Sequence, residues 1–392
     1  MPNATPNART RSSPLGRWIG PLGWGFYLAV SWTWVIGMVL PAFMLLDYGW
    51  WALLVFFVPN AAGAAAMGFV LRDTRAADRL RERHSAMVRV FSIVTIAFHL
   101  FVLLTLLTPR TSLQWSILAA VPLGTAACVI ARTGRVLTTL AALVWLASVA
   151  LLAGFVIEGG EPSWSQPAFD FFGEDLLFVA PACALGFACC PYLDATFLRA
   201  RSETTVAGGR VAFAFGFFGP FAAMIAGTVL YASGLVTGAL AAGTYVLAHL
   251  AVQSAFTMGV HTREAAVHAS GLIVAMLLAG AAFVAMSLLP ESPTWAAGMS
   301  PGRILYYVFL SAYGLLFPAY VLLSMLPTAL RLPPLPAKAW LVIVPALAGA
   351  AAAFAAGFIA KEEQWLPLGI GVLLAAAFAT YALRRRAGAA RG

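Results

Sequence analysis

A few polar side chains lie in the middle of long apolar runs, where their chemistry is most informative. Asn60, His99 and His249 each sit at the centre of such a run. Ser254 and Thr257 follow His249 on the same run and, three residues apart, share one helical face. Polar groups at mid-membrane are costly, so these residues are candidates for a binding site.

Each of these groups also has a structural interpretation. An intramembrane histidine can donate one hydrogen bond to a neighbouring carbonyl, and serine or threonine hydroxyls often bond to their own helix. Asp194, near the end of another apolar run, could pair with Arg199 or Arg201 at the membrane edge. Both interpretations stay open on the sequence.

Helix-breaking residues give a second signal. The stretch "SWTWVIGMVLP" places Gly37 and Pro41 inside one apolar run, and "APACALGFACCPYLDATF" places Pro181, Gly186 and Pro191 inside another. A break at membrane depth frees backbone groups that only protein or a wet cavity can satisfy. The predicted solute-binding residues are Trp34, Gly37, Asn60, His99, Gly186, Tyr192 and His249.

The composition fixes the class of protein that must position these residues. The 392 residues are 61% hydrophobic and 10% charged, with a mean hydropathy of +0.88. Only lipid can solvate such a chain, so we expect an all-α polytopic membrane protein. The four cysteines have no metal or redox spacing, and no HExxH, GxSG or Asp-rich pair is present. We therefore expect no enzyme and no resident cofactor.

Hydropathy along the chain predicts twelve spans. They cover residues 19–46, 49–71, 88–108, 113–131, 136–157, 174–198, 209–232, 237–260, 267–289, 303–328, 339–360 and 366–383. The expected organisation is an N-terminal tail 1–18, a transmembrane domain 19–383 and a basic tail 384–392. The arginine-rich segment after the second span has the pattern of a short amphipathic helix along the inner surface.

The basic residues predict an orientation. With both termini in the cytoplasm, 21 of the 24 Lys and Arg lie on the cytoplasmic side, and only Arg110, Arg303 and Lys361 lie outside. This distribution satisfies the positive-inside rule and favours the plasma (inner) membrane. It also explains the net charge of +9 without nucleic acid, so the bilayer is the expected partner.

A five-span period relates the two halves. The breaks in the first and sixth spans correspond, as do Pro59 with Pro220 and His99 with His249. Because five is odd, the second repeat would enter the membrane from the opposite side. The pattern predicts an inverted repeat of residues 19–157 and 174–328, with two extra helices over 339–383.

The first quarter of the chain resembles a known family. "GFYLAVSWTWVIGMVLPAFMLLDYGWWALLVFFVPNAAGAAAMGFVL" is similar to the opening of sodium/solute symporters of the APC superfamily, which have the LeuT-type fold. The resemblance implies a solute site between broken helices 1 and 6, walled by the third and eighth. It also implies a sodium ion held by carbonyls of Ser31 to Gly37 and by the hydroxyls of Ser254 and Thr257.

The expected function is secondary active transport of a small organic solute, with sodium as the expected coupling ion. Two alternatives stay open. A major-facilitator-type carrier also has twelve spans, although Gly68 and Asp73 are five apart where that family has a spacing of four. A non-transporting membrane sensor or assembly protein is the other, since the two hydroxyls are not adjacent as they often are in the symporters.

Overall fold

The described part of the chain is entirely helical. The computed structural model describes residues 14–105, 111–160, 173–236, 243–291 and 293–389, with side chains from residue 19 onward, and contains no strand among them. Ten of its helices are long and apolar enough to cross a membrane, or up to eleven if the bent pair α1 and α2 counts as one span. The prediction of a polytopic all-α membrane protein is confirmed.

The helices follow the predicted spans closely. Their bounds are α1 Pro14–Trp32, α2 Val35–Tyr48, α3 Trp51–Val70, α4 Thr74–Arg83, α5 Ser85–Thr105, α6 Ser112–Ile130, α7 Gly134–Ile157, α8 Leu176–Cys189, α9 Ala195–Ser202, α10 Val206–Gly216, α11 Ala222–Thr228, α12 Ala232–Val236, α13 Thr244–Glu264, α14 Ala269–Leu288, α15 Pro301–Ser311, α16 Phe317–Tyr320, α17 Leu326–Ala329, α18 Trp340–Phe358 and α19 Trp365–Ala389. Parts of the predicted tails, of the third span and of the eighth span lie outside the described residues.

The predicted eighth span is the helix α13, which is less apolar than the ten. It holds His249, Gln253, Ser254, Thr257 and His261, all of them buried inside the protein. A helix whose polar side chains face protein needs less apolar surface than one that faces lipid. The twelve predicted spans therefore correspond to ten apolar helices or up to eleven, together with this polar, interior one.

Three π-helical turns occur among the described residues in the second half of the bundle. A π-helical turn, Phe217–Phe221, joins α10 to α11, and two more, Ala312–Leu316 and Val321–Met325, interrupt the segment from α15 to α17. A π turn inserts one extra residue into a helix and often occurs at functional sites. Pro220 lies within the first of these turns.

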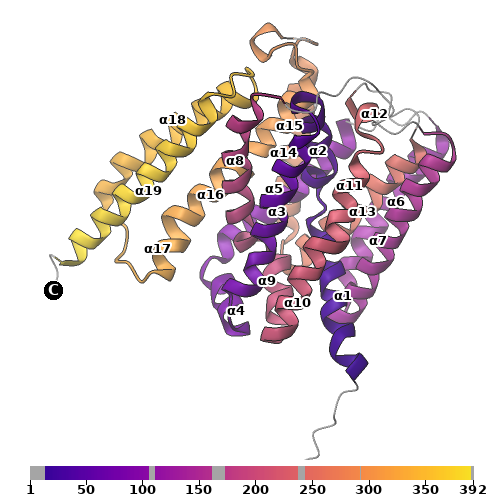
Figure 1. Cartoon of the computed structure of the whole chain (residues 1–392), viewed down its shortest axis with the longest axis horizontal. Helices are drawn as coiled ribbons and strands as arrows, with labels where there is room; N and C mark the ends of the chain where they lie inside the picture. The colour runs from indigo at the N-terminus through magenta and orange to yellow at the C-terminus, as the bar shows by residue number, and fades with distance from the viewer. Residues whose placement is uncertain (1–13, 106–110, 161–172, 237–242, 292, 390–392) are drawn as a thin grey trace, which may run out of the picture.

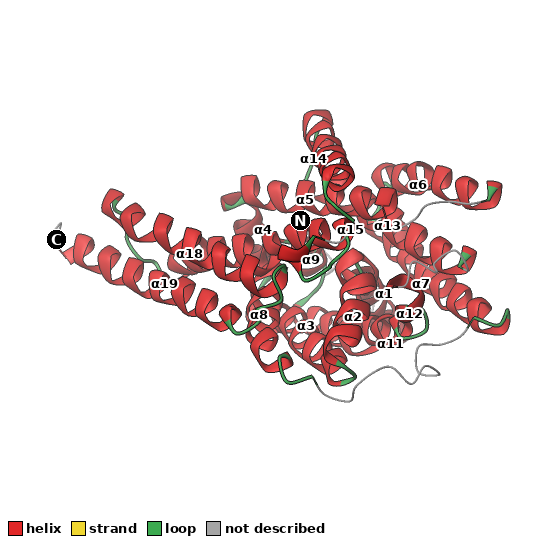
Figure 2. Ribbon diagram, turned by 90° about the horizontal axis from the view of Figure 1, so that it is seen from above, coloured by secondary structure: helices red, strands yellow, loops and turns green. Residues whose placement is uncertain are grey.

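The helices run side by side between two ends of the molecule (Figure 1). The start of α1, the helix α4 and the helix α9 lie at the lower end, here called the α4 end. The end of α2 and the start of α15 lie at the upper end, the α15 end. Seen from above, the pair α18 and α19 forms a hairpin that projects from one edge of the bundle (Figure 2).

The predicted amphipathic segment is the helix α4. The Asp73 side chain caps it by accepting a hydrogen bond from the Ala76 N–H at 2.5 Å. Its charged side chains, such as Arg79, are exposed, whereas Ala77 is buried. The helix packs against α9 and α5 at the α4 end. The segment Thr74–Arg83 is therefore a helix.

Glycines allow two helix pairs to approach backbone to backbone. A Cβ on Gly216 of α10 would lie 2.7 Å from the Gly25 carbonyl oxygen of α1. A Cβ on Gly63 of α3 would lie 2.5 Å from the Phe187 carbonyl oxygen of α8. Real Cβ atoms do not come this close to backbone oxygen, so both positions require glycine.

Candidate functional site

The first predicted span is broken at its centre. The helix α1 ends at Trp32, α2 begins at Val35, and their axes differ by 60°. Trp34 between them is extended, with φ −75° and ψ 178°. The Thr33 hydroxyl donates to the Ala29 carbonyl at 2.7 Å, and the Trp34 indole N–H donates to the Ser31 carbonyl. The indole satisfies the Ser31 carbonyl, which the break would otherwise leave unpaired, whereas the Ala29 carbonyl also accepts from the Thr33 backbone N–H at 2.9 Å.

The position of this break differs from the one that Gly37 and Pro41 suggested. Both residues lie inside the regular part of α2. Glycine and proline are tolerated in membrane helices when neighbouring helices pack around them. The break instead occurs where Thr33 and Trp34 can bond to the end of the preceding helix.

The sixth predicted span is interrupted as well. The helix α8 ends at Cys189, a 3₁₀ turn covers Cys190–Leu193, and α9 begins at Ala195. Pro191 lies at the start of the 3₁₀ turn, where its missing N–H costs little. Asp194 is extended and caps α9 by accepting from the Thr196 N–H at 2.7 Å.

The two interrupted segments meet in the interior. The hydroxyls of Ser31 and Thr196 lie 3.0 Å apart, and the rings of Trp32 and Phe197 have centroids 4.8 Å apart. All four side chains are buried. The end of α1 and the start of α9, which are about 160 residues apart in the sequence, therefore form one contact.

A pocket extends from this contact toward the α15 end. The space in it that no atom fills is about 730 Å³, and this volume includes the part that is open to the surroundings. Its walls come from α2, α3, α8, the segment α15 to α16, and the end of α18. The lining residues used below are Trp32, Trp34, Gly37, Tyr48, Asn60, Cys183, Gly186, Phe187, Cys190, Tyr307, Tyr313, Gly314 and Phe358.

Four of the predicted site residues line this pocket: Trp34, Gly37, Asn60 and Gly186. The Asn60 side-chain oxygen accepts a hydrogen bond from the Trp32 indole N–H at 2.6 Å. A Cβ on Gly186 would lie 3.1 Å from the Tyr313 carbonyl oxygen, so glycine lets α8 approach that segment. The sequence predicted these residues as solute-binding, and the structure brings them together around one pocket.

The other three predicted solute-binding residues, His99, His249 and Tyr192, are not among the lining residues. His99 bonds through Nδ1 to the Thr95 carbonyl of its own helix at 2.8 Å, and the ring of His249 lies 5.9 Å from that of Tyr231. Tyr192 is half-buried in the 3₁₀ turn. Depth alone did not tell which way these side chains face around their helices.

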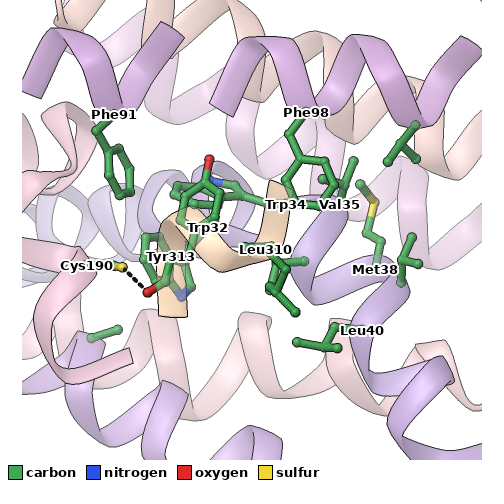
Figure 3. Close-up of a cluster of buried hydrophobic side chains, with 14 of the residues drawn as sticks. Trp32, Trp34, Val35, Met38, Leu40, Phe91, Phe98, Cys190, Leu310 and Tyr313 are labelled. Carbon is green, nitrogen blue, oxygen red and sulfur yellow. Dashed lines mark hydrogen bonds between the residues drawn. The ribbon is translucent and has the colours of Figure 1, made fainter. Parts of the chain in front are cut away.

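Several lining residues were missed in the sequence. Tyr313 and Gly314 belong to a π-helical turn of the tenth predicted span, and Phe91, Trp34 and Tyr313 form a cluster of rings beside the pocket (Figure 3). The Cys190 thiol donates to the Tyr313 carbonyl at 3.3 Å. The stretch "SAYGLLFPAY", which holds a glycine four residues before a proline, was the signal that could have found this turn.

The two hydroxyls expected to bind a cation lie on α13, and one of them contacts the end of α1. The Thr257 hydroxyl of α13 donates to the Val30 carbonyl of α1 at 3.4 Å. The Ser254 hydroxyl, one turn earlier, is buried and has no hydrogen-bond partner among the described residues. The structure therefore brings Thr257 to the last turn of α1, one residue before the predicted carbonyl donors Ser31 to Gly37.

A cluster of charged groups, here called the rim cluster, lies at the α15 end of the pocket. Asp47 at the end of α2 pairs with Arg303 of α15 and with Lys361 at 2.6 Å. Glu363 accepts from the Tyr48 hydroxyl at 2.8 Å, and the Lys361 ammonium lies 3.7 Å from the same carboxylate oxygen. Since Tyr48 lines the pocket, this cluster ties α2, α15 and the α18–α19 hairpin together at its mouth.

Comparison of the chain with protein families, with curated proteins and with solved structures finds no match in any of the three. The fold and the site are therefore the basis for assigning a function.

Proposed function

We propose that this protein is a secondary active transporter that carries a small, uncharged, largely apolar or aromatic organic solute. The observation that carries the proposal is the contact between two interrupted membrane segments at the base of an interior pocket. Interrupted helices at mid-membrane are retained where the freed backbone groups serve a site. A plain structural bundle has no need of them.

The helix pairing supports an inverted repeat of five spans. The second span packs on the sixth (α3 on α8), and the seventh packs on the first (α10 on α1). The fourth packs on the eighth (α6 on α13), and the ninth packs on the third (α14 on α5). Adding five to each span number, and restarting the count after the tenth span, turns the pair 2–6 into 7–1 and the pair 4–8 into 9–3. This is the pairing expected of the LeuT-type fold, with α18 and α19 as additions.

The pocket lining supports the substrate class. Its members are aromatic, aliphatic or small, and no charged side chain is among them. Trp34, Tyr313 and Phe187 offer ring surfaces for an organic solute, and Asn60 offers an amide. The helix start in the sixth span could favour an anionic solute, but the Asp194 carboxylate already caps that helix. An uncharged solute fits this lining better.

The proposal includes an orientation and a membrane. The α4 end carries most of the Lys and Arg side chains, including those of α4 itself, and we assign it to the cytoplasm. Both ends of the chain would then be cytoplasmic, and the pocket would extend toward the outer face of the plasma membrane.

The test is solute binding and uptake with a pocket-filling variant. A thermal-shift screen of uncharged aromatic and aliphatic solutes on the detergent-purified protein selects a ligand, because a ligand that binds the folded state raises its stability. Uptake of that ligand into proteoliposomes then measures transport. Cys183→Phe, which places a ring in the pocket, is expected to weaken binding by more than about tenfold, or ~1.4 kcal/mol.

Cys183→Ala is the matched control, because it removes the thiol without filling the pocket. Its affinity for the solute and its uptake rate should stay within about twofold of the parent values. A tenfold loss of affinity would correspond to ~1.4 kcal/mol. Equal binding by Cys183→Phe and the parent would place the solute elsewhere. Binding without any uptake or exchange would favour a sensor over a transporter.

A further inference from the structure

A fully buried carboxylate and a fully buried imidazole face each other beneath the pocket. The Oδ2 atom of Asp194 lies 3.7 Å from Nε2 of His261, and both side chains have no exposed surface. Neither of these two atoms has a hydrogen-bond partner among the described residues. The other polar atom of each side chain does have a partner. Asp194 Oδ1 accepts a hydrogen bond from Thr196, and His261 Nδ1 lies 3.0 Å from the Ser92 hydroxyl.

The pair connects directly to the break and to the pocket. The ring of His261 lies 5.4 Å from that of Trp34, which lines the pocket and forms the break in the first span. Thr196, which bonds to Asp194, also bonds to Ser31 at the end of α1. A change of charge at the pair therefore acts on both interrupted segments.

No cation neutralises Asp194. The sequence left open a pairing with Arg199 or Arg201, and the structure shows neither. Arg199 pairs with Glu203 at 2.7 Å and with Glu264 at 3.7 Å, while Arg201 donates to backbone carbonyls. The other titratable groups that face the pair are Tyr27, His99, Cys190 and Tyr313. Arg199, Arg263 and Glu264 lie farther toward the α4 end, and Arg81 faces Glu264.

An unpaired carboxylate in such an interior is costly, and one proton removes the cost. The proton can sit on Asp194 Oδ2 or on His261 Nε2, and a small approach from the present 3.7 Å would let it form a hydrogen bond between the two unpartnered atoms. Addition of the proton requires no other reactant than water at one membrane face. The pair thereby changes its net charge from minus one to zero.

We propose that Asp194 and His261 together bind one exchangeable proton, and that this proton is coupled to movement of the two interrupted segments. The inference rests on the proposed transport function for its physiological meaning, but the proton site itself is measurable without any solute. It differs from the sodium site expected at Ser254 and Thr257, which contains no acidic group.

The test is a pH titration of the full-length protein in detergent, with two signals recorded. Infrared difference spectra detect the carbonyl stretch of a protonated buried carboxyl. Tryptophan fluorescence detects an imidazolium beside Trp34, because a protonated imidazole quenches a neighbouring indole, and Trp34→Phe identifies that component. The parent protein is expected to give at least one of these signals, and Asp194→Asn is expected to lose it completely.

Asp194→Asn is a conservative change because the amide oxygen keeps the bonds from Thr196 and the cap of α9. Glu203→Gln, which alters a partly exposed acid of the α4 end, is the matched control and should leave both signals unchanged. His261→Gln is a second, independent variant and should move the midpoint of the carboxyl signal by about one pH unit or more. Absence of both signals in the parent, or their persistence in Asp194→Asn, overturns the proposal.

Two further arms separate this proposal from its rivals. The titration midpoint should be the same in sodium chloride and in choline chloride, and a shift with sodium would reassign the pair as a sodium site. In proteoliposomes, a pH gradient should drive uptake of the screened solute at least about threefold in the parent and not in Asp194→Asn. If no solute moves but Asp194→Asn loses the signals, the transport function fails and the proton site stands.

Discussion

At the residue scale, the two hydroxyls of the candidate cation site differ in their hydrogen bonding. Thr257 already contacts the Val30 carbonyl, whereas Ser254 is buried without a partner among the described residues. Sodium prefers five or six hard oxygen ligands, and hydroxyls with backbone carbonyls supply them without a formal charge. An unpartnered buried hydroxyl costs free energy unless a ligand compensates for it.

We predict that Ser254→Ala and Thr257→Ala each raise the sodium concentration for half-maximal uptake by about tenfold, since each removes one ligand worth ~1.4 kcal/mol. Thr262→Ala is the matched control, because its hydroxyl lies on the same helix but bonds to the Met258 carbonyl at 2.7 Å. The measurement is initial uptake into proteoliposomes against sodium concentration. An uptake that does not depend on sodium would rule out the cation site.

Residue identity and depth were readable in the sequence, but direction around a helix was not. Gly186 and Asn60 line the pocket, whereas His99 and His249, predicted at similar depth, contact other neighbours. Nearly every face of an interior membrane helix is apolar. The hydropathy pattern therefore does not show which face of the helix points toward the pocket. Asp194 was recognised as polar, but its partner His261 lies 67 residues away and could be found only in the fold.

At the element scale, spans were predictable and interruptions were only partly so. A run of about 20 apolar residues marks a membrane helix whatever its neighbours. A break depends on local bonds, and in the first span it falls at Thr33 and Trp34 rather than at Gly37 or Pro41. Similarly, nothing in the apolar pattern distinguishes a π-helical turn such as Ala312–Leu316 from regular helix.

The close approach of α1 and α10 leads to a stability prediction. Gly216→Ala would place a Cβ 2.7 Å from the Gly25 carbonyl oxygen, and overpacking of this kind costs about 1–3 kcal/mol. Gly219→Ala, three residues later, meets only the Phe215 ring at 3.6 Å and should change stability by less than about 1 kcal/mol. Thermal unfolding in detergent measures both variants. Equal melting temperatures would contradict the contact.

At the scale of the whole molecule, the two ends differ in the chemistry they present. The α4 end carries α4 with its arginines, the short helix α9 and the start of α1 (Figure 1). The α15 end carries the rim cluster and the connection between α14 and α15. The distribution of basic residues alone allowed this division to be predicted, because it depends on span number and not on packing.

The orientation gives a labelling prediction. Glu291→Cys, exposed near the α15 end, should react with a membrane-impermeant maleimide in intact cells. Glu203→Cys at the α4 end should react only after the membrane is opened. The four native cysteines are buried, which keeps their background low. Labelling in the reverse pattern would invert the proposed topology.

The rim cluster has an electrical consequence. Its two acids, Asp47 and Glu363, and its two bases, Arg303 and Lys361, have opposite and equal formal charge. Moving a unit charge across a membrane potential changes the free energy by about 2.3 kcal/mol per 100 mV, but a neutral group does no such work. In the proposed transport cycle, opening of the pocket at this end would therefore move no net charge, and the proposed proton at Asp194 and a sodium ion at the candidate cation site would be the charges on which the membrane potential acts.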